Sequence, residues 1–127
     1  MQEDVLIKKY FYNLNYIVLC EMYLNEYLKP DVIEEKDLKK YNPGHLGTSL
    51  SLNFIQANLN YFLNKNKLTS KTVIGTGHAG VSLISNLWLN GILKDYYPKY
   101  SLDKKGLNNV IKDFAETIRS EINPEYP

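Results

Sequence analysis

Residues 71–80 read Lys-Thr-Val-Ile-Gly-Thr-Gly-His-Ala-Gly, and this stretch decides the predicted fold. The β-branched run Thr72–Ile74 is typical of a short buried strand, which Gly75 ends abruptly. An apolar segment at helical spacing follows from about Ala79 to Leu93. A strand, a glycine-rich loop and a helix in this order predict an α/β fold with Thr72–Ile74 as the beginning of a parallel sheet.

Three other segments carry apolar residues at helical spacing. They run from about Val5 to Leu28, from about Ser49 to Leu63 and from Leu107 to Ile118. Hydroxyl side chains that could cap the last two helices are Thr48, Ser49, Ser51 and Ser101. The charged segment 31–41 predicts a short helix or a loop. One strand cannot form a sheet, so either the chain is mostly helical or its strand joins a sheet that other residues complete.

Composition limits the function classes. The chain has 127 residues, which allow one domain, and 15 Lys and Arg against 14 Asp and Glu, a net charge of +1. This balance predicts neither duplex nucleic acid nor an anionic membrane as a partner. The N-terminus is acidic, unlike a signal peptide, and polar residues interrupt the most apolar stretch, so we expect a soluble cytoplasmic protein without a membrane span. The one cysteine, Cys20, is expected to be a buried thiol.

The two histidines of the chain lie in two glycine-containing loops, residues 43–49 and 75–80, each before a predicted helix. Glycine allows close backbone approach, helix N-termini attract phosphate, and histidine changes charge near neutral pH. His45 and His78 could therefore share one anion site, or each could be a turn residue. The second loop also spells G-x-G-x-x-G, but no second strand follows for a dinucleotide fold. The histidines and Cys20 lack zinc-ligand spacing, so no metal site is predicted.

Several stretches in the same order resemble the N-terminal region of phosphoketolases. They are residues 44–48 (Gly-His-Leu-Gly-Thr), residues 52–60 and residues 73–80, and the resemblance extends across nearly the whole chain. This resemblance implies a transketolase-like, thiamine-diphosphate-binding fold, of which residues 1–127 would form the N-terminal part of the first domain, without the second domain. The family cleaves xylulose 5-phosphate or fructose 6-phosphate with phosphate, giving acetyl phosphate, and uses thiamine diphosphate and Mg²⁺ in carbohydrate metabolism.

The resemblance also implies roles for individual residues. His45 and His78 would line the substrate channel as catalytic residues, and Thr48, Gly75, Gly77 and His78 would lie beside the cofactor. The Gly-Asp-Gly motif that holds magnesium and diphosphate in the family does not occur here. We therefore expect a lyase fragment that is inactive alone and binds the cofactor poorly. The alternatives are a split subunit completed by a partner chain, and a non-catalytic module that binds phosphate or a sugar phosphate.

The apolar content of the predicted helices bears on association. If the sheet is incomplete, Trp88 and its neighbours should face the place where further strands would lie. This would leave an exposed apolar patch larger than monomers usually carry. We therefore expect self-association or poor solubility, with Phe54, Phe62 and Trp88 among the responsible residues.

Overall fold

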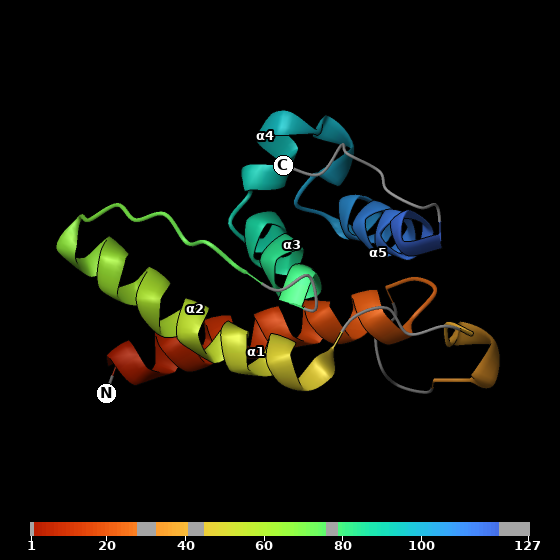
Figure 1. The fold of residues 1–127 in the computed structure, drawn as a ribbon, viewed down its shortest axis with the longest axis horizontal. Coiled ribbons are helices and arrows are strands. Elements are labelled where there is room, and N and C mark those ends of the chain that lie inside the picture. Colours follow the sequence, from red (N-terminus) through yellow and green to blue (C-terminus); the bar gives the residue numbers. More distant parts are fainter. Residues whose placement is uncertain (1, 28–32, 41–44, 76–78, 120–127) are drawn as a thin grey trace.

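The chain forms a mostly helical bundle (Figure 1). Its structure is a computed structural model that describes residues 2–27, 33–40, 45–75 and 79–119, with side chains up to residue 114. The elements are α1 (Gln2–Tyr23), the 3₁₀ turn η1 (Glu35–Asp37), α2 (Leu46–Asn66), α3 (Gly80–Leu89), α4 (Ile92–Tyr96), the 3₁₀ turn η3 (Pro98–Tyr100) and α5 (Lys104–Arg119). Helix α1 lies at the centre and contacts α2, α3 and α5.

The predicted strand does not form. Residues 68–75 have neither helix nor strand, and none of the described residues belongs to a strand longer than an isolated bridge. Val73 has 90% of its surface exposed, so it is not the buried strand residue that its β-branched neighbourhood predicts. A strand is stabilised by hydrogen bonds to a neighbouring strand. The described part of the chain offers no such neighbour, so residues 72–74 do not form the predicted strand and the predicted parallel sheet is not seen in this structure.

The four helical segments are confirmed, but their ends shift. The predicted third helix, Ala79–Leu93, is two helices separated by a turn at Asn90 and Gly91. Gly91 has a φ of +75°, in the left-handed region that favours glycine, so the chain can turn there into α4. At the end of α2, Lys67 adopts the left-handed conformation (φ 53°), and the N–H of Leu68 reaches the Leu63 carbonyl at 2.9 Å.

The helix caps also differ from the predicted ones. Asp103, rather than Ser101, caps α5, since its Oδ1 accepts the Gly106 N–H at 2.8 Å. The residue that precedes α2 is His45, so Thr48, Ser49 and Ser51 lie inside the helix. Hydroxyl-bearing residues are common both at caps and in first turns, so composition alone does not fix the first residue of a helix.

The core is helical rather than a helix-on-sheet layer. Its main cluster joins α1, α3, α4, η3 and α5 through Ile17, Cys20, Leu24, Trp88, Leu93, Tyr100, Leu107, Val110 and Ile111. The expectation that Trp88 faces an incomplete sheet is wrong, because this side chain is buried and its indole N–H donates to the Ser101 carbonyl at 3.2 Å. Cys20 is a buried thiol, as predicted, and burial raises its pKa to about 11.

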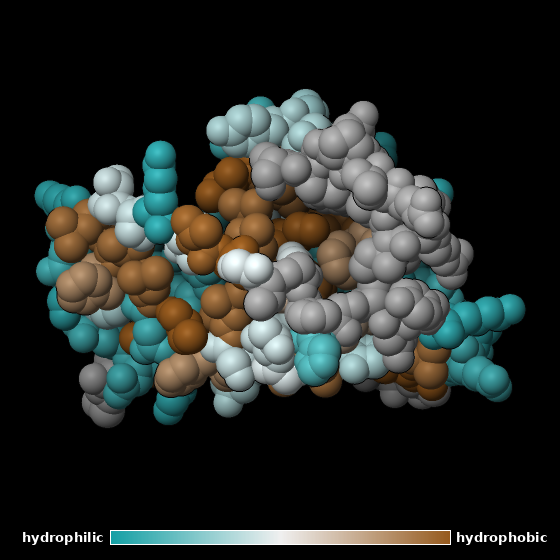
Figure 2. All heavy atoms as spheres, in the orientation of Figure 1, coloured by the Kyte–Doolittle hydropathy of each residue, from teal (hydrophilic) through white to brown (hydrophobic). Residues whose placement is uncertain are grey.

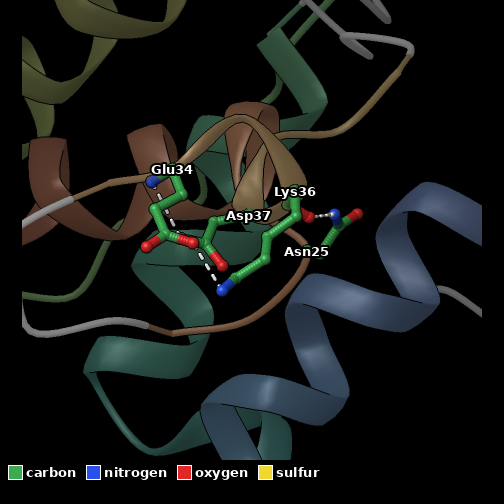
Figure 3. A network of polar contacts seen from close by, with 4 residues as sticks. All are labelled: Asn25, Glu34, Lys36 and Asp37. Carbon is green, nitrogen blue, oxygen red and sulfur yellow. Dashed lines mark hydrogen bonds and ion pairs between the residues drawn. The ribbon is translucent and has the colours of Figure 1, made fainter.

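The segment 33–40 returns to the C-terminal end of α1. Leu38 forms an isolated antiparallel bridge with Leu24, and the Asn25 side-chain amide donates to the Lys36 carbonyl at 3.0 Å (Figure 3). The Glu34 N–H donates to the Asp37 carboxylate at 2.9 Å, and Lys36 forms an ion pair with Glu34 (Figure 3). These exposed contacts hold the turn η1 beside α1.

Candidate functional site

His45 is the residue that immediately precedes α2. Its backbone is extended (φ −124°, ψ 104°), and its carbonyl accepts the Ser49 N–H at 3.0 Å, the first turn of the helix. The residue is exposed, and its imidazole makes no capping hydrogen bond. The imidazole is thus carried at the positive end of a helix of 21 residues. Free N–H groups and the helix dipole favour an anion at such an end.

The first turn of α2 is open to solvent. Gly47 and Thr48 are both exposed, and a Cβ added to Gly47 would have nothing within 4 Å. A ligand could therefore approach the backbone of Gly47 and the Thr48 hydroxyl without moving other parts of the protein. A binding role for Thr48 requires such an accessible hydroxyl, and that role stays a prediction.

The second predicted loop is described only at its two ends. Gly75 is exposed, with nothing within 4 Å of an added Cβ, and Ala79 is the buried residue before α3. Thr76, Gly77 and His78 lie outside the described residues. The approach of His78 to His45 therefore stays a prediction.

One hydrogen bond connects the first turn of α3 to α2. The Ser82 hydroxyl, in the first turn of α3, donates to Oδ1 of Asn53 in α2, and the Asn53 amide donates to Asn15 at 2.7 Å. At 1.5 Å rise per residue, Asn53 lies roughly 12 Å along α2 from His45. The first turn of α3 is thus fixed beside α2 about two turns after His45. Ala79 and Gly80, the described C-terminal end of the 75–80 loop, therefore lie close to this part of α2.

Sequence reasoning missed a polar seam between α1, α2 and α3, most of whose side chains are buried or half-buried. Its central contacts are made by the Asn60 amide, which donates to the Tyr10 hydroxyl at 3.0 Å and to Asn86 Oδ1 at 3.1 Å. We call "polar seam" the set Tyr10, Asn15, Ser49, Asn53, Gln56, Asn60, Ser82, Asn86 and Asn90. Polar residues at 49, 53, 56 and 60 recur at helical spacing, a signal that a search for apolar periodicity passes over.

A buried carboxyl group lies on the other side of α1. Glu21 has no exposed surface, accepts a hydrogen bond from the Ser85 hydroxyl, and has no partner for its Oε1 among the described residues. Burial raises the pKa of Glu21 from 4.5 to about 8, against the opposing effects of Ser85 and the Lys39 ammonium. The helices around it give this group a shifted pKa but no open path to a ligand, so we assign it to packing.

The described residues do not fit thiamine diphosphate together with its metal ion. They contain no group of three or more His, Cys, Asp or Glu side chains that could hold a metal. Magnesium takes carboxylate oxygens in proteins, and the first turn of α2 carries no acidic residue. These residues could contribute contacts to a cofactor, but they do not hold its metal, so no reaction step is assigned through it.

The comparisons with known proteins decide the family. A family model described as the XFP N-terminal domain matches residues 2–127. "Probable phosphoketolase 2" of Lactiplantibacillus plantarum is 34% identical over 124 residues. The chain belongs to the phosphoketolase family. "Xylulose-5-phosphate phosphoketolase" of Lactiplantibacillus pentosus is also 34% identical over 124 residues, and "Probable phosphoketolase" of Schizosaccharomyces pombe is 37% identical over 97 residues.

The matches cover most of this chain and little of each relative. The alignment with each Lactiplantibacillus relative covers 95% of this chain and 16% of the relative. The alignment with the Schizosaccharomyces pombe relative covers 75% of this chain and 12% of that protein. The resemblance of residues 44–48, 52–60 and 73–80 to phosphoketolases is confirmed at the level of the family. None of the described helices is both long and apolar enough to cross a membrane.

Proposed function

We propose that this chain acts as the N-terminal part of a phosphoketolase first domain, and that it supplies substrate-contacting residues to a site that further phosphoketolase sequence completes. The completed site would cleave xylulose 5-phosphate or fructose 6-phosphate with phosphate to give acetyl phosphate. The observation that carries the proposal is the match of residues 2–127 to the N-terminal family model. Localisation in the cytoplasm belongs to the same proposal.

Within that site we assign substrate contact to His45. An exposed imidazole before a helix of this length can donate to, or accept from, a phosphate or hydroxyl oxygen of the sugar phosphate. His78 would contact the same ligand from the 75–80 loop. Thr48, Gly75 and Gly77 would lie beside thiamine diphosphate, with the Thr48 hydroxyl and the glycine backbone as the contacting groups.

We propose that the chain alone does not catalyse ketose cleavage. Thiamine diphosphate supplies the reactive carbon centre when it is bound with Mg²⁺, and the protein must hold both. The sequence contains no Gly-Asp-Gly motif, and the described residues include no cluster of metal ligands. The histidines can position a substrate or move a proton, but they cannot replace the cofactor.

Acetyl phosphate formation tests this function. The purified chain is assayed with xylulose 5-phosphate, phosphate, thiamine diphosphate and Mg²⁺, alone and together with a form of the Lactiplantibacillus pentosus relative that lacks its matched region. We expect no product from the chain alone and product from the combination. We expect His45→Ala to lower that activity at least tenfold, and Asn66→Ala, at the other end of α2, to leave it unchanged.

Three outcomes would contradict the proposal. Acetyl phosphate made by the chain alone would show that the inactivity we expect is wrong. Undiminished activity of the combination with His45→Ala would remove His45 from the site. A combination that forms a complex but no acetyl phosphate would favour the alternative of a non-catalytic binding module.

A further inference from the structure

Helix α2 buries mainly polar residues and exposes three large apolar ones. Its buried residues are Ser49, Asn53, Gln56 and Ala57, three of which are polar. By contrast, Phe54, Ile55 and Phe62 have 60%, 58% and 55% of their surfaces exposed. We call these three residues the outer face. A helix on the surface of a globular protein normally shows the opposite arrangement, with its apolar side toward the core.

Helical geometry makes the two sides opposite. At roughly 100° per residue, Phe54, Ile55 and Phe62 fall within one sector of about 100°, whereas Asn53, Gln56 and the other buried positions centre about 180° away. The buried side is held by the polar seam, so the helix cannot rotate its aromatic residues inward without breaking those hydrogen bonds. The outer face is thus a fixed surface of the fold.

The outer face continues onto α1. The rings of Phe54 and Phe11 meet edge to face, with centroids 5.9 Å apart and planes at 86°. Tyr12, the next residue of α1, is exposed and lies 6.1 Å from Phe11, ring centroid to ring centroid. Figure 2 shows hydrophobic residues gathered over the C-terminal half of α2 and the connection that follows it. Aromatic residues in a cluster across two elements are typical of protein interfaces.

The connection of residues 67–75 adds unpaired backbone next to this surface. It runs from the end of α2 back toward α3 (Figure 1). Among the described residues, 69–75 form no backbone hydrogen bond to one another or to a helix. Leu68 and Val73 are exposed, and residues 72–74 have high strand propensity. Such a segment can add to the edge of a sheet on another polypeptide.

The chain matches only a part of the phosphoketolase polypeptide, and this indicates what covers the surface. The chain corresponds to 16% of its Lactiplantibacillus relatives, so about five-sixths of a phosphoketolase polypeptide lies outside the matched region. We propose that the outer face and the connection 67–75 form the docking surface for that remaining phosphoketolase polypeptide, which offers an apolar surface to Phe54, Ile55 and Phe62. This inference rests on the proposed function and names its partner.

A matched pair of substitutions tests the docking surface. Ile55→Glu places a charge in the outer face, and Ile33→Glu places the same charge on an isoleucine that is 50% exposed in another segment. Each variant is co-expressed with the tagged form of the Lactiplantibacillus pentosus relative that lacks its matched region. We expect the wild type and Ile33→Glu to co-purify in equal amounts, and Ile55→Glu and Phe62→Glu to be retained at least tenfold less.

Circular dichroism of each isolated variant verifies that its helix content is unchanged. Ile55→Glu retained as well as Ile33→Glu would overturn the proposal, as would a wild-type chain that does not co-purify. If the chain forms a dimer that Ile55→Glu dissociates but that the remaining polypeptide leaves intact, the surface binds a second copy of the chain instead. Co-purification without acetyl phosphate would contradict the proposed function and leave the docking surface intact. Full acetyl phosphate production with Ile55→Glu would contradict the docking surface and leave the proposed function intact.

Discussion

The Ser85 hydroxyl donates a hydrogen bond to the carboxylate of Glu21, a side chain without exposed surface between α1 and α3. Lys39 lies close to Glu21, and its ammonium donates to the Ile111 carbonyl at 3.0 Å and to the backbone carbonyl of Glu21. One hydroxyl and a cation directed at backbone carbonyls do not compensate for the removal of a carboxylate from water. The carboxyl group is therefore held in its neutral form to an unusually high pH.

This carboxyl group predicts a decline of stability with pH. Burial raises the pKa of Glu21 from 4.5 to about 8, so the folded state keeps a proton that the unfolded state releases. A raised pKa contributes stability that is fully present below pH 4.5 and is lost as pH rises to about 8. We expect the free energy of unfolding, from urea titrations, to fall in this window by roughly 1 kcal/mol per pH unit.

Glu21→Gln should flatten this pH dependence, because the amide keeps a carbonyl for Ser85 and has no proton to lose. It should also raise stability above pH 7. The matched control is Glu3→Gln, since Glu3 is an exposed carboxylate whose pKa is lowered by its hydrogen bond and ion pair with Lys65. That control should leave the slope between pH 4.5 and 8 unchanged. Equal slopes for wild type and Glu21→Gln would show that Glu21 is ionised throughout.

Gly106 is required by close packing in the first turn of α5. A Cβ at this position would meet the backbone carbonyl and amide of Ser101, which cannot move aside as a flexible side chain could. We expect Gly106→Ala to lower the free energy of unfolding by about 1–3 kcal/mol or more, as overpacking does. Urea titration at one pH measures this loss.

Gly47→Ala is the corresponding control in α2. A Cβ there has open space and alanine favours a helix, so this variant should be stabilised by about 0.5–1 kcal/mol. If Gly106→Ala is as stable as wild type, the turn of residues 101–106 does not have the close contact described here.

Trp88, the single tryptophan, reports on the helical core. Its indole is buried among α1 and α5 side chains and donates to the Ser101 carbonyl. We expect a blue-shifted emission spectrum that moves to the red on unfolding. Trp88→Ala should cost about 3–5 kcal/mol of stability. Tyr96→Ala, at an exposed position of α4, should change stability by less than about 0.5 kcal/mol. A solvent-exposed emission spectrum of the native chain would contradict the described core.

Apolar spacing located every long helix, because local periodicity is written in the sequence itself. It did not identify the buried side of α2. There, Leu52, Ile55, Leu59 and Phe62 share helical spacing, yet Ile55 and Phe62 face outward. The buried side is decided by polar partners on α1 and α3, such as Asn15 and Ser82, which lie far away in the sequence. Which side of a helix is covered is a tertiary property that periodicity alone does not contain.

The strand prediction failed for a related reason. Residues 72–74 have the composition of a strand, but a strand also needs a paired neighbour. The described residues provide none, so the segment stays a connection. For the candidate site, the glycine-histidine pattern located His45 correctly before a helix. It could not predict Glu21 or the polar seam, whose partners are separated by up to 80 residues.

The association expected from Phe54 and Phe62 becomes a prediction for the isolated chain. Both side chains are exposed on the outer face, whereas Trp88 is buried and should contribute nothing. Sedimentation at tens of micromolar, roughly the range of weak association, should show self-association of the wild type. Phe62→Glu should lower it, and Ile33→Glu should not. A monomeric wild type at this concentration would contradict the prediction.

His45 leads to a prediction of anion binding by the isolated chain. An imidazole before α2, beside the exposed first turn of Gly47 and Thr48, should bind inorganic phosphate weakly, on the order of millimolar. Phosphate titrations followed by the histidine ring resonances in NMR spectra measure this, with chloride at equal ionic strength as the control. His45→Ala should weaken binding several-fold while the variant stays folded, which circular dichroism measures. Phosphate binding that is equal in wild type and His45→Ala would assign His45 to the turn alone.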